Sequence, residues 1–157
     1  MSSEPGLSIL LFIVSIVVVI IDQLVKLLVL SSMTLGLSIP ICPGVFHITY
    51  IQNPGAAFGI LAEQRWIFIV ASGILLVGAV CFYQRLQKES PAIKYGTALL
   101  LGGAMGNLID RIWRGQVIDF LDFRVWPVFN IADIAIVIGV GGIMYALLQQ
   151  DGKEADR

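Results

Sequence analysis

The sequence predicts an all-α membrane protein with four transmembrane helices and a small extramembrane β-sheet. The chain has 157 residues, of which 57% are hydrophobic and 13% are charged, whereas soluble domains are roughly 45 to 50% apolar. Its mean hydropathy is +0.88. The apolar residues gather in four runs, each long enough as a helix to cross a hydrocarbon core of roughly 30 Å. These runs leave no room for a separate soluble domain, so we expect one integral membrane domain over residues 1–157.

The first span is expected over about residues 7–30. Its few polar residues include Asp22 and Lys26, and a spacing of four places these two side chains on one face of a helix. The run is longer than the apolar part of a secretory signal, starts without positive charge and is followed by no small-residue cleavage site. We therefore predict a retained helix.

The next segment, residues 31–65, is expected to lie outside the membrane because it is rich in glycine, proline and polar residues. Within it, the β-branched and aromatic run Val45–Ile51 predicts a strand, which points to a small sheet. The segment ends in a polar and glycine-containing run at residues 53–58.

The second and third spans are expected at about residues 66–83 and 93–111, joined by a short polar turn. The third span carries Gly102, Gly103 and Gly106, and such small residues let a neighbouring helix approach closely. The remaining segments are a second extramembrane loop at residues 112–127 and a fourth span at about 128–148.

The distribution of basic residues predicts the orientation of these spans. The turn between the second and third spans contains Arg85 and Lys88, the C-terminal tail contains Lys153 and Arg157, and residues 33–64 contain neither lysine nor arginine. Cytoplasmic loops carry the excess of lysine and arginine. Both termini are therefore expected in the cytoplasm, and residues 31–65 and 112–127 on the outer side.

Several classes of function are disfavoured by composition. The net charge is −1, so no basic surface suggests nucleic acid. Cys42 and Cys81 have no metal-type or redox-type spacing and are expected unpaired near opposite membrane faces. The single histidine, His47, lies in the predicted strand as an ordinary interfacial side chain. No zinc motif and no glycine-rich phosphate loop is present, so no cofactor or metal is expected.

The polar residues of the spans converge at one depth, near the outer surface. Asn107 and Arg111 are spaced by four and Asn130 and Asp133 by three, so each pair shares a helix face. Asn53 just precedes the second span. One interpretation is a common polar site; the other, which stays open for Asp22 with Lys26 and for Asp110 with Arg111, is ion pairing that joins helices. The converging residues are Asp22, Lys26, Asn53, Asn107, Asp110, Arg111, Asn130 and Asp133.

Two carboxylates are the candidates for chemistry, Asp119 in a connecting segment and Asp133 about one turn inside the fourth span. Neither has a basic residue three or four positions away. Two aspartates brought together do not both ionise easily, so one keeps a proton. Such a pair can deprotonate water while it protonates a carbonyl oxygen, and it titrates as a coupled unit. This arrangement suits aspartic peptide hydrolysis, with a bell-shaped pH profile.

At these residues the chain closely resembles the lipoprotein signal peptidases, or signal peptidase II, of bacterial membranes. Five motifs occur in the family order between residues 22 and 133, and together they are highly specific. They are Asp22-Gln23-x-x-Lys26, Asn53-Pro54-Gly55-Ala56-Ala57-Phe58, Gly102-Gly103-Ala104-Met105-Gly106-Asn107-Leu108-Ile109-Asp110-Arg111, Val117-Ile118-Asp119-Phe120 and Phe129-Asn130-Ile131-Ala132-Asp133.

The resemblance implies a four-span aspartic endopeptidase of the bacterial inner membrane, with its site near the outer face. Such enzymes remove the signal peptide of prolipoproteins by cutting before a diacylglyceryl-modified cysteine, and globomycin-type cyclic peptides inhibit them. Membrane lipid is the expected surrounding, and the protein is expected to be a monomer. The family's catalytic pair falls on Asp119 and Asp133. Residues implied in substrate binding or in support of the pair are Asn53, Gly55, Asn107, Arg111, Asn130, Asp22, Lys26 and Asp110.

The resemblance also implies a β-sheet cradle and a mobile helical flap on the outer face, which correspond to Val45–Ile51 and to residues 54–64. Two other functions remain open from the residues alone. A small proton-coupled carrier or channel subunit would also keep intramembrane polar groups, but it is expected to carry them along the full depth. An assembly subunit would use its aspartates only for stability.

Overall fold

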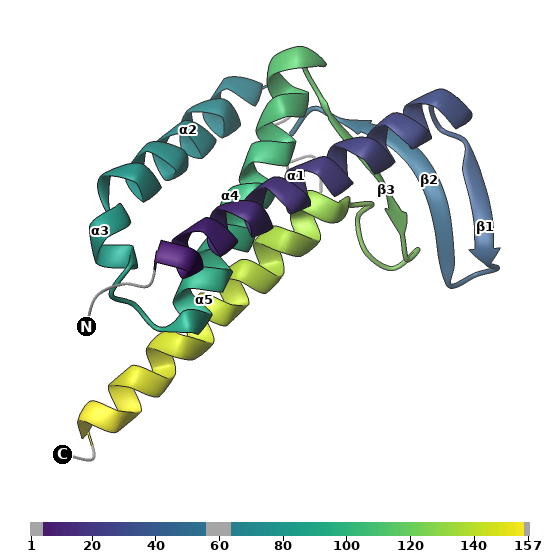
Figure 1. Ribbon diagram of the computed structural model, residues 1–157. Helices are drawn as coiled ribbons and strands as arrows, with labels where there is room; N and C mark the ends of the chain where they lie inside the picture. The colour runs from purple at the N-terminus through teal and green to yellow at the C-terminus, as the bar shows by residue number, and fades with distance from the viewer. Residues whose placement is uncertain (1–4, 56–63, 156–157) are drawn as a thin grey trace.

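The computed structural model describes residues 5–55 and 64–155 of the chain. The described part is mostly helical with one small sheet (Figure 1). Four long helices lie where the sequence predicts spans. The elements in chain order are α1 (Pro5–Ser32), β1 (Ser38–Cys42), β2 (Phe46–Asn53), α2 (Arg65–Cys81), α3 (Tyr83–Leu86), α4 (Pro91–Trp113), β3 (Val117–Asp122) and α5 (Ile131–Ala155).

The helices carry the apolar surface expected of a membrane protein. Within the described residues, α1 and α5 are long and apolar enough to cross a bilayer, over Leu11–Ser32 and Ile131–Gln150, and α2 is a shorter apolar helix. Large apolar side chains are exposed along all three, such as Leu28 (64%) and Ile74 (68%). Because exposed apolar patches of this size are unusual in soluble proteins, lipid is the natural partner of these faces.

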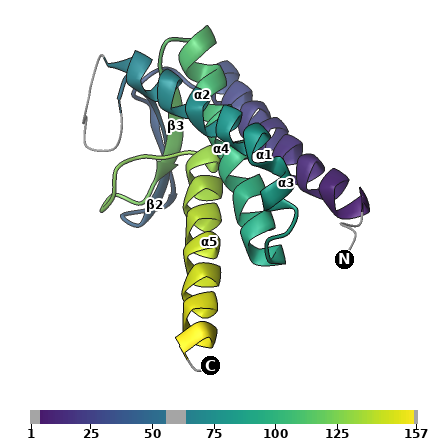
Figure 2. The same cartoon turned by 90° about the vertical axis from the view of Figure 1, so that its left-hand side faces the viewer.

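The middle of the molecule is α4, which packs against α1, α2 and α5 (Figures 1 and 2). Glycines permit these approaches, as the sequence predicted. A Cβ added to Gly103 would lie 2.3 Å from the carbonyl oxygen of Ala132 on α5, and one added to Gly102 would lie 2.8 Å from that of Ser15 on α1. Backbones this close leave no room for a side chain.

The three strands form an antiparallel sheet in the order β1-β2-β3. β2 confirms the strand predicted at Val45–Ile51. β3 was not predicted, because residues 112–127 were expected to form a single loop. It pairs with β2 so that Asp119 lies opposite Ile51 and Val117 opposite Asn53. Asp119 therefore lies on a strand whose backbone is held by sheet hydrogen bonds, and not in an irregular connection.

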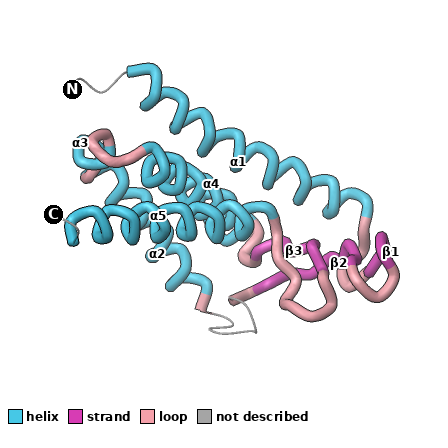
Figure 3. The backbone as a smooth tube through the Cα atoms, turned by 90° about the horizontal axis from the view of Figure 1, so that it is seen from below, coloured by secondary structure: helices cyan, strands magenta, loops and turns pink. Residues whose placement is uncertain are grey.

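The sheet lies at one end of the helices, beside the C-terminal end of α1 (Figure 3). One face of it packs on α1. The start of α1 and the end of α5 lie at the opposite end of the molecule (Figure 3). The buried cluster that joins the sheet to the helices consists of Val29, Met33, Tyr50, Ile118 and Phe120.

The N-terminal end of α5 is fixed to β3. Phe129 exchanges backbone hydrogen bonds with Leu121, of 2.8 Å and 3.1 Å. The helix then begins at Ile131, three residues after the expected start of the fourth span. This pairing places Asn130 and the first turn of α5 beside the strand that carries Asp119.

Candidate active site

Asp119 is a buried carboxylate at the junction of sheet and helices. Its side chain comes from β3 and is 1% exposed. One oxygen, Oδ2, accepts a hydrogen bond of 2.9 Å from Asn53 Nδ2 at the end of β2. The other, Oδ1, accepts one of 2.6 Å from Asn130 Nδ2. Both oxygens are thus held by amide donors from neighbouring elements.

Asp133 is held by the start of α5 through a capping box. Asn130 Oδ1 accepts the backbone N–H of Asp133 at 3.0 Å, and Asp133 Oδ2 accepts the backbone N–H of Asn130 at 3.1 Å. This reciprocal pair satisfies helix N–H groups that have no partner inside the helix. A carboxylate in the first turn also interacts favourably with the helix dipole. Asn130 therefore donates to both carboxylates: its side-chain amide donates to Asp119, and its backbone N–H donates to Asp133.

Asn107 of α4 completes the contacts of the pair. Its Nδ2 donates to Asp133 Oδ1 at 2.8 Å. Its Oδ1 accepts two hydrogen bonds of 3.1 Å, one from Lys26 Nζ and one from Asn130 Nδ2. Each Asp133 oxygen consequently has a donor, as each Asp119 oxygen does.

The orientation of all three amides follows from groups that only donate hydrogen bonds. Asn130 Oδ1 faces the N–H of Asp133, and Asn53 Oδ1 faces the N–H of Gly55 at 3.0 Å. Asn107 Oδ1 faces an ammonium. A flipped amide would place two donors against each other. The three NH₂ groups must therefore point at the carboxylates.

A buried ion cluster lies behind Asn107. Lys26 Nζ is 2.8 Å from Asp22 Oδ2 and 2.7 Å from Asp110 Oδ2, and all three residues are fully buried. With the bond to Asn107, the three N–H groups of the ammonium have three acceptors. Arg114, one helical turn after Asp110, pairs with its other oxygen.

This cluster joins three helices. Asp22 Oδ1 accepts the N–H of Ala132 in α5 at 2.9 Å, and Asp110 Oδ2 accepts the N–H of Ile118 in β3 at 3.3 Å. The ion pair of Asp22 with Lys26 that the sequence left open is present. The proposed pairing of Asp110 with Arg111 is replaced by hydrogen-bonded pairs with Lys26 and Arg114.

Arg111 instead turns toward the pair of aspartates and the start of the loop after β2. Its Nη2 donates to the carbonyl oxygen of Gly55 at 3.1 Å, and its guanidinium lies 4.6 Å from the ring centroid of Phe68. Its charge interacts with Asp119 and Asp133. The flap expected at residues 54–64 falls largely on residues 56–63, which lie outside the described residues.

The structure brings every candidate residue into one hydrogen-bonded network, with its members on α1, β2, α4, β3 and α5 and in the loop after β2. Two participants were missed. Arg114 follows Asp110 by four residues, the spacing that pairs charges on a helix. Gln23 donates to Asp22, Gly106 and Asp110, at 3.1, 3.1 and 3.2 Å.

The pKa of Asp119 is raised from 3.8 to about 7. Burial is the main cause and the nearby charge of Asp133 the second, while hydrogen bonds from Asn53 and Asn130 act in the opposite direction. Near neutral pH, Asp119 therefore holds a proton for a substantial part of the time. The described residues contain no group of three or more side chains suited to a metal ion. What the site offers is a protonated carboxyl beside a second carboxylate.

Comparison with known proteins agrees with this geometry. The family model described as signal peptidase (SPase) II matches residues 14–149. The lipoprotein signal peptidase of Pelotomaculum thermopropionicum is 45% identical over 147 residues, which cover 94% of this chain and 97% of that protein. That of Halothermothrix orenii is 48% identical over 140 residues, covering 89% and 96%.

A solved structure described as a bacterial membrane enzyme superposes with a TM-score of 0.84 at 36% identity, covering 95% of this chain and 92% of that chain. A second one with the same description has a TM-score of 0.78 at 37% identity, covering 92% and 94%. Sequence and fold thus agree over nearly the whole length. The chain belongs to the signal peptidase II family, the lipoprotein signal peptidases.

Proposed function

We propose that this protein is an intramembrane aspartic endopeptidase that removes the signal peptide of prolipoproteins, and that it cuts before the diacylglyceryl-modified cysteine with Asp119 and Asp133 as the catalytic pair. Membership of the family supports the protease activity and the class of substrate. One observation supports the two residues most strongly. Asn130 donates to Asp119 with its side chain and to Asp133 with its backbone, so a single residue holds both carboxylates.

The pKa of Asp119, about 7, suggests how the two aspartates divide the work. Asp133 acts as the base and takes a proton from a water molecule, which attacks the carbonyl carbon of the scissile bond. Asp119 gives its proton to the carbonyl oxygen as the tetrahedral intermediate forms. When the intermediate collapses, the C–N bond breaks and the leaving nitrogen takes up a proton from the pair.

The surrounding amides keep the pair ready for this exchange. Asn53, Asn107 and Asn130 only donate to the carboxylates, so none of them competes for the shared proton. Arg111 adds a fixed positive charge beside the pair and holds the Gly55 carbonyl at the start of the loop after β2. We infer that this loop and Arg111 bind the substrate backbone near the scissile bond.

We also propose that all four long helices cross the inner membrane, with both termini in the cytoplasm and the site near the outer face. The start of α1 and the end of α5 are both at the end of the molecule opposite the sheet (Figure 3), and this supports the arrangement. Cys42 on β1 and Cys81 on α2 are both free and exposed. In intact cells a membrane-impermeant maleimide should label Cys42 and leave Cys81 unlabelled; labelling of Cys81 alone would invert the orientation.

The depth of the site suits a substrate that is itself anchored in lipid, because its modified cysteine lies near the membrane surface. We expect the protein to act as a monomer surrounded by membrane lipid. We also expect globomycin-type cyclic peptides to inhibit it by occupying the site. The alternative, a proton-coupled carrier, receives no support from the family match.

Mass spectrometry of cleaved peptides tests the proposed function. The purified protein in detergent is given a synthetic prolipoprotein peptide with a diacylglyceryl cysteine, and a matched peptide without the lipid. We expect one new N-terminus, the lipidated cysteine, and no cleavage of the unmodified peptide. A folded protein that cuts neither peptide, and that carries protons across liposome membranes, would overturn the proposal in favour of the carrier.

A further inference from the structure

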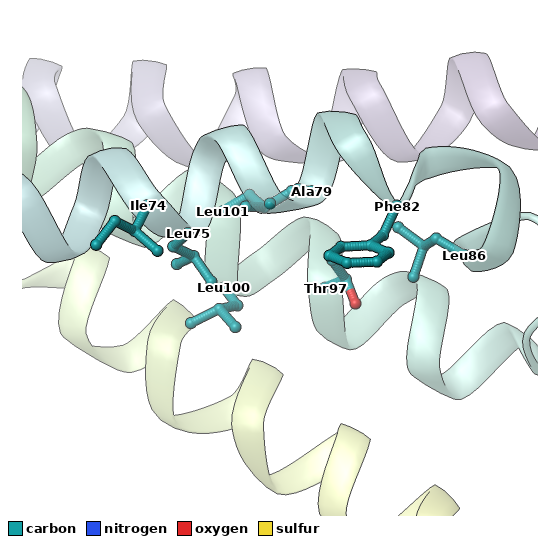
Figure 4. A pocket seen from close by; sticks show the side chains of 9 residues that line it. Ile74, Leu75, Ala79, Phe82, Leu86, Thr97, Leu100 and Leu101 are labelled. Carbon is teal, nitrogen blue, oxygen red and sulfur yellow. The ribbon is translucent and has the colours of Figure 1, made fainter.

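An apolar groove lies between α2 and α4, outside the candidate active site. It is an open groove with a volume of about 400 Å³. Thr97 is the polar residue among those that line it. Its hydroxyl donates a hydrogen bond to the backbone oxygen of Ile93 at 2.8 Å, so the hydroxyl hydrogen does not point into the groove as a free donor. Side chains from both helices and from the short α3 project toward one another across it (Figure 4). The large apolar residues along it are Ile74, Leu75, Phe82, Leu86, Leu100 and Leu101.

The groove is in line with the aspartate pair. Leu100, Asn107 and Arg111 are spaced by seven and four residues, so they lie on one face of α4. At a rise of 1.5 Å per residue, Leu101 lies about 9 Å along α4 from Asn107, the residue that contacts Asp133. On α2 the groove starts at Ile74, again about 9 Å beyond Phe68, the ring under the Arg111 guanidinium.

The near half of the groove is within reach of an acyl chain that starts near the pair of aspartates. From Ile74 to Phe82 it follows α2 for about 12 Å, which places its far end about 21 Å from Phe68. One acyl chain reaches across about half of the roughly 30 Å hydrocarbon core, or about 15 Å. A glyceryl group and the first carbons would bridge the interval before the groove. The remaining chain would then lie inside it.

We propose that this groove binds one acyl chain of the substrate's diacylglyceryl group and contributes to its specificity. The inference rests on the proposed peptidase function, since only a lipidated cysteine held at the aspartates presents a chain at this position. The occupant is a long hydrocarbon chain, because the groove is lined almost wholly by apolar side chains that follow one another along α2 and α4. Burial of its methylenes gives a preference for long chains over short ones.

Two glycines of α2 provide a matched test. A Cβ added at either Gly73 or Gly78 meets no atom within 4 Å, so both positions accept a side chain. Only Gly78 lines the groove. Gly78→Leu should fill part of the groove, and Gly73→Leu should not. Ala79→Leu offers a second groove variant if Gly78→Leu proves unstable.

The experiment compares kcat/KM on two prolipoprotein peptides that differ only in their acyl chains, palmitoyl or butyryl. For Gly78→Leu we expect a loss of about tenfold on the palmitoyl peptide, as for about two displaced methylenes, and little change on the butyryl peptide. Gly73→Leu should behave as wild type on both. Equal losses on both peptides, or equal effects of the two glycine variants, would overturn the assignment of the groove to the substrate's acyl chain. Failure of wild type on both peptides would count against the proposed function itself.

Discussion

The ammonium of Lys26 donates to Asn107 Oδ1 over 3.1 Å, and Asn107 in turn donates to Asp133 Oδ1 over 2.8 Å. Because an ammonium cannot accept a hydrogen bond, this contact fixes the amide with its NH₂ group toward the carboxylate. A fully buried charge on α1 thus controls the surroundings of an aspartate on α5 that it does not touch.

Lys26→Met should reduce both stability and cleavage. The variant leaves Asp22 and Asp110 buried without their shared cation, and breaking a buried ion pair in this way costs roughly 3 to 5 kcal/mol. Chemical or thermal unfolding in detergent measures the first effect, and turnover of a prolipoprotein peptide measures the second. Lys88→Met is the control, because Lys88 is exposed and its loss should change neither quantity.

A second substitution separates positioning from stability. In the Lys26→Met background, Asp22→Asn removes one unpaired charge and keeps an oxygen for the Ala132 N–H. The double variant should recover part of the lost stability but not the lost turnover, since Asn107 stays free to flip. Recovery of both in parallel would contradict the positioning role of Lys26.

Asn130→Ser tests whether the side-chain amide matters beyond its role as a helix cap. Serine keeps an N-cap oxygen for the Asp133 N–H, so the first turn of α5 should stay formed. It loses the donor to Asp119, and a hydrogen bond to a charged group contributes about 1.5 to 3 kcal/mol, so turnover should fall by roughly ten- to a hundredfold. Wild-type turnover in a stable Asn130→Ser protein would show that Asp119 does not depend on this amide.

Gly103→Ala should separate α4 from α5 where the two aspartates are held. The added Cβ would lie 2.3 Å from the Ala132 oxygen, so the helices must move apart, at a cost of about 1 to 3 kcal/mol. Gly141→Ala, on α5 and with no atom within 4 Å of the added Cβ, should leave stability equal or higher. Thermal unfolding of the two variants side by side makes the comparison. Equal melting temperatures would mean that the close approach of α4 and α5 is not needed.

The pH dependence follows from the raised pKa of Asp119, about 7. If one aspartate must be protonated and the other ionised, kcat/KM should follow a bell-shaped curve with its alkaline limb near pH 7. It should fall at acid pH as the second carboxylate takes up a proton. A single loss of rate at high pH without an acid limb would contradict the shared proton.

The same shift makes stability depend on pH. The folded state binds the Asp119 proton more tightly than the unfolded state, so this group's contribution to stability is largest below pH 3.8 and is lost as pH rises through about 7. Asp119→Asn should therefore flatten the fall of stability between pH 4 and pH 8. Asp122→Asn is a control for which we expect the opposite pH dependence. Burial opposes ionisation of Asp122, but hydrogen bonds from Thr49 and Arg124 outweigh the effect of burial and lower the pKa of Asp122. Its stabilising contribution is lost as pH falls.

Much of the architecture could be predicted from local pattern. Apolar runs placed the long helices, and the spacing of Asn107 with Arg111 and of Asn130 with Asp133 placed these residues on common faces. The capping box could also have been read from Asn130 and Asp133 three residues apart, and it would have moved the start of α5 to Ile131.

What the sequence could not supply depends on contacts between distant segments. The run Val117–Asp122 is short and almost wholly buried, and it is a strand because β2 pairs with it. Lys26 is a partner of Asp110 because α1 packs against α4, and the spacing of residues along the chain does not reveal this packing. The i,i+4 relation of Asp110 and Arg114 was available from the sequence, but only the adjacent Arg111 was considered as a partner of Asp110.

Turnover of a diacylglyceryl-modified prolipoprotein by wild type, Asp119→Asn and Asp133→Asn, with the melting temperature of each, tests whether Asp119 and Asp133 are the catalytic pair. Asp122→Asn, on the same strand as Asp119, is the matched control. We expect cleavage by wild type and Asp122→Asn, and none by Asp119→Asn or Asp133→Asn although both remain folded. Cleavage at the wild-type rate by either dyad variant would contradict the assignment, and Asp22 and Asp110 would then be the carboxylates to test.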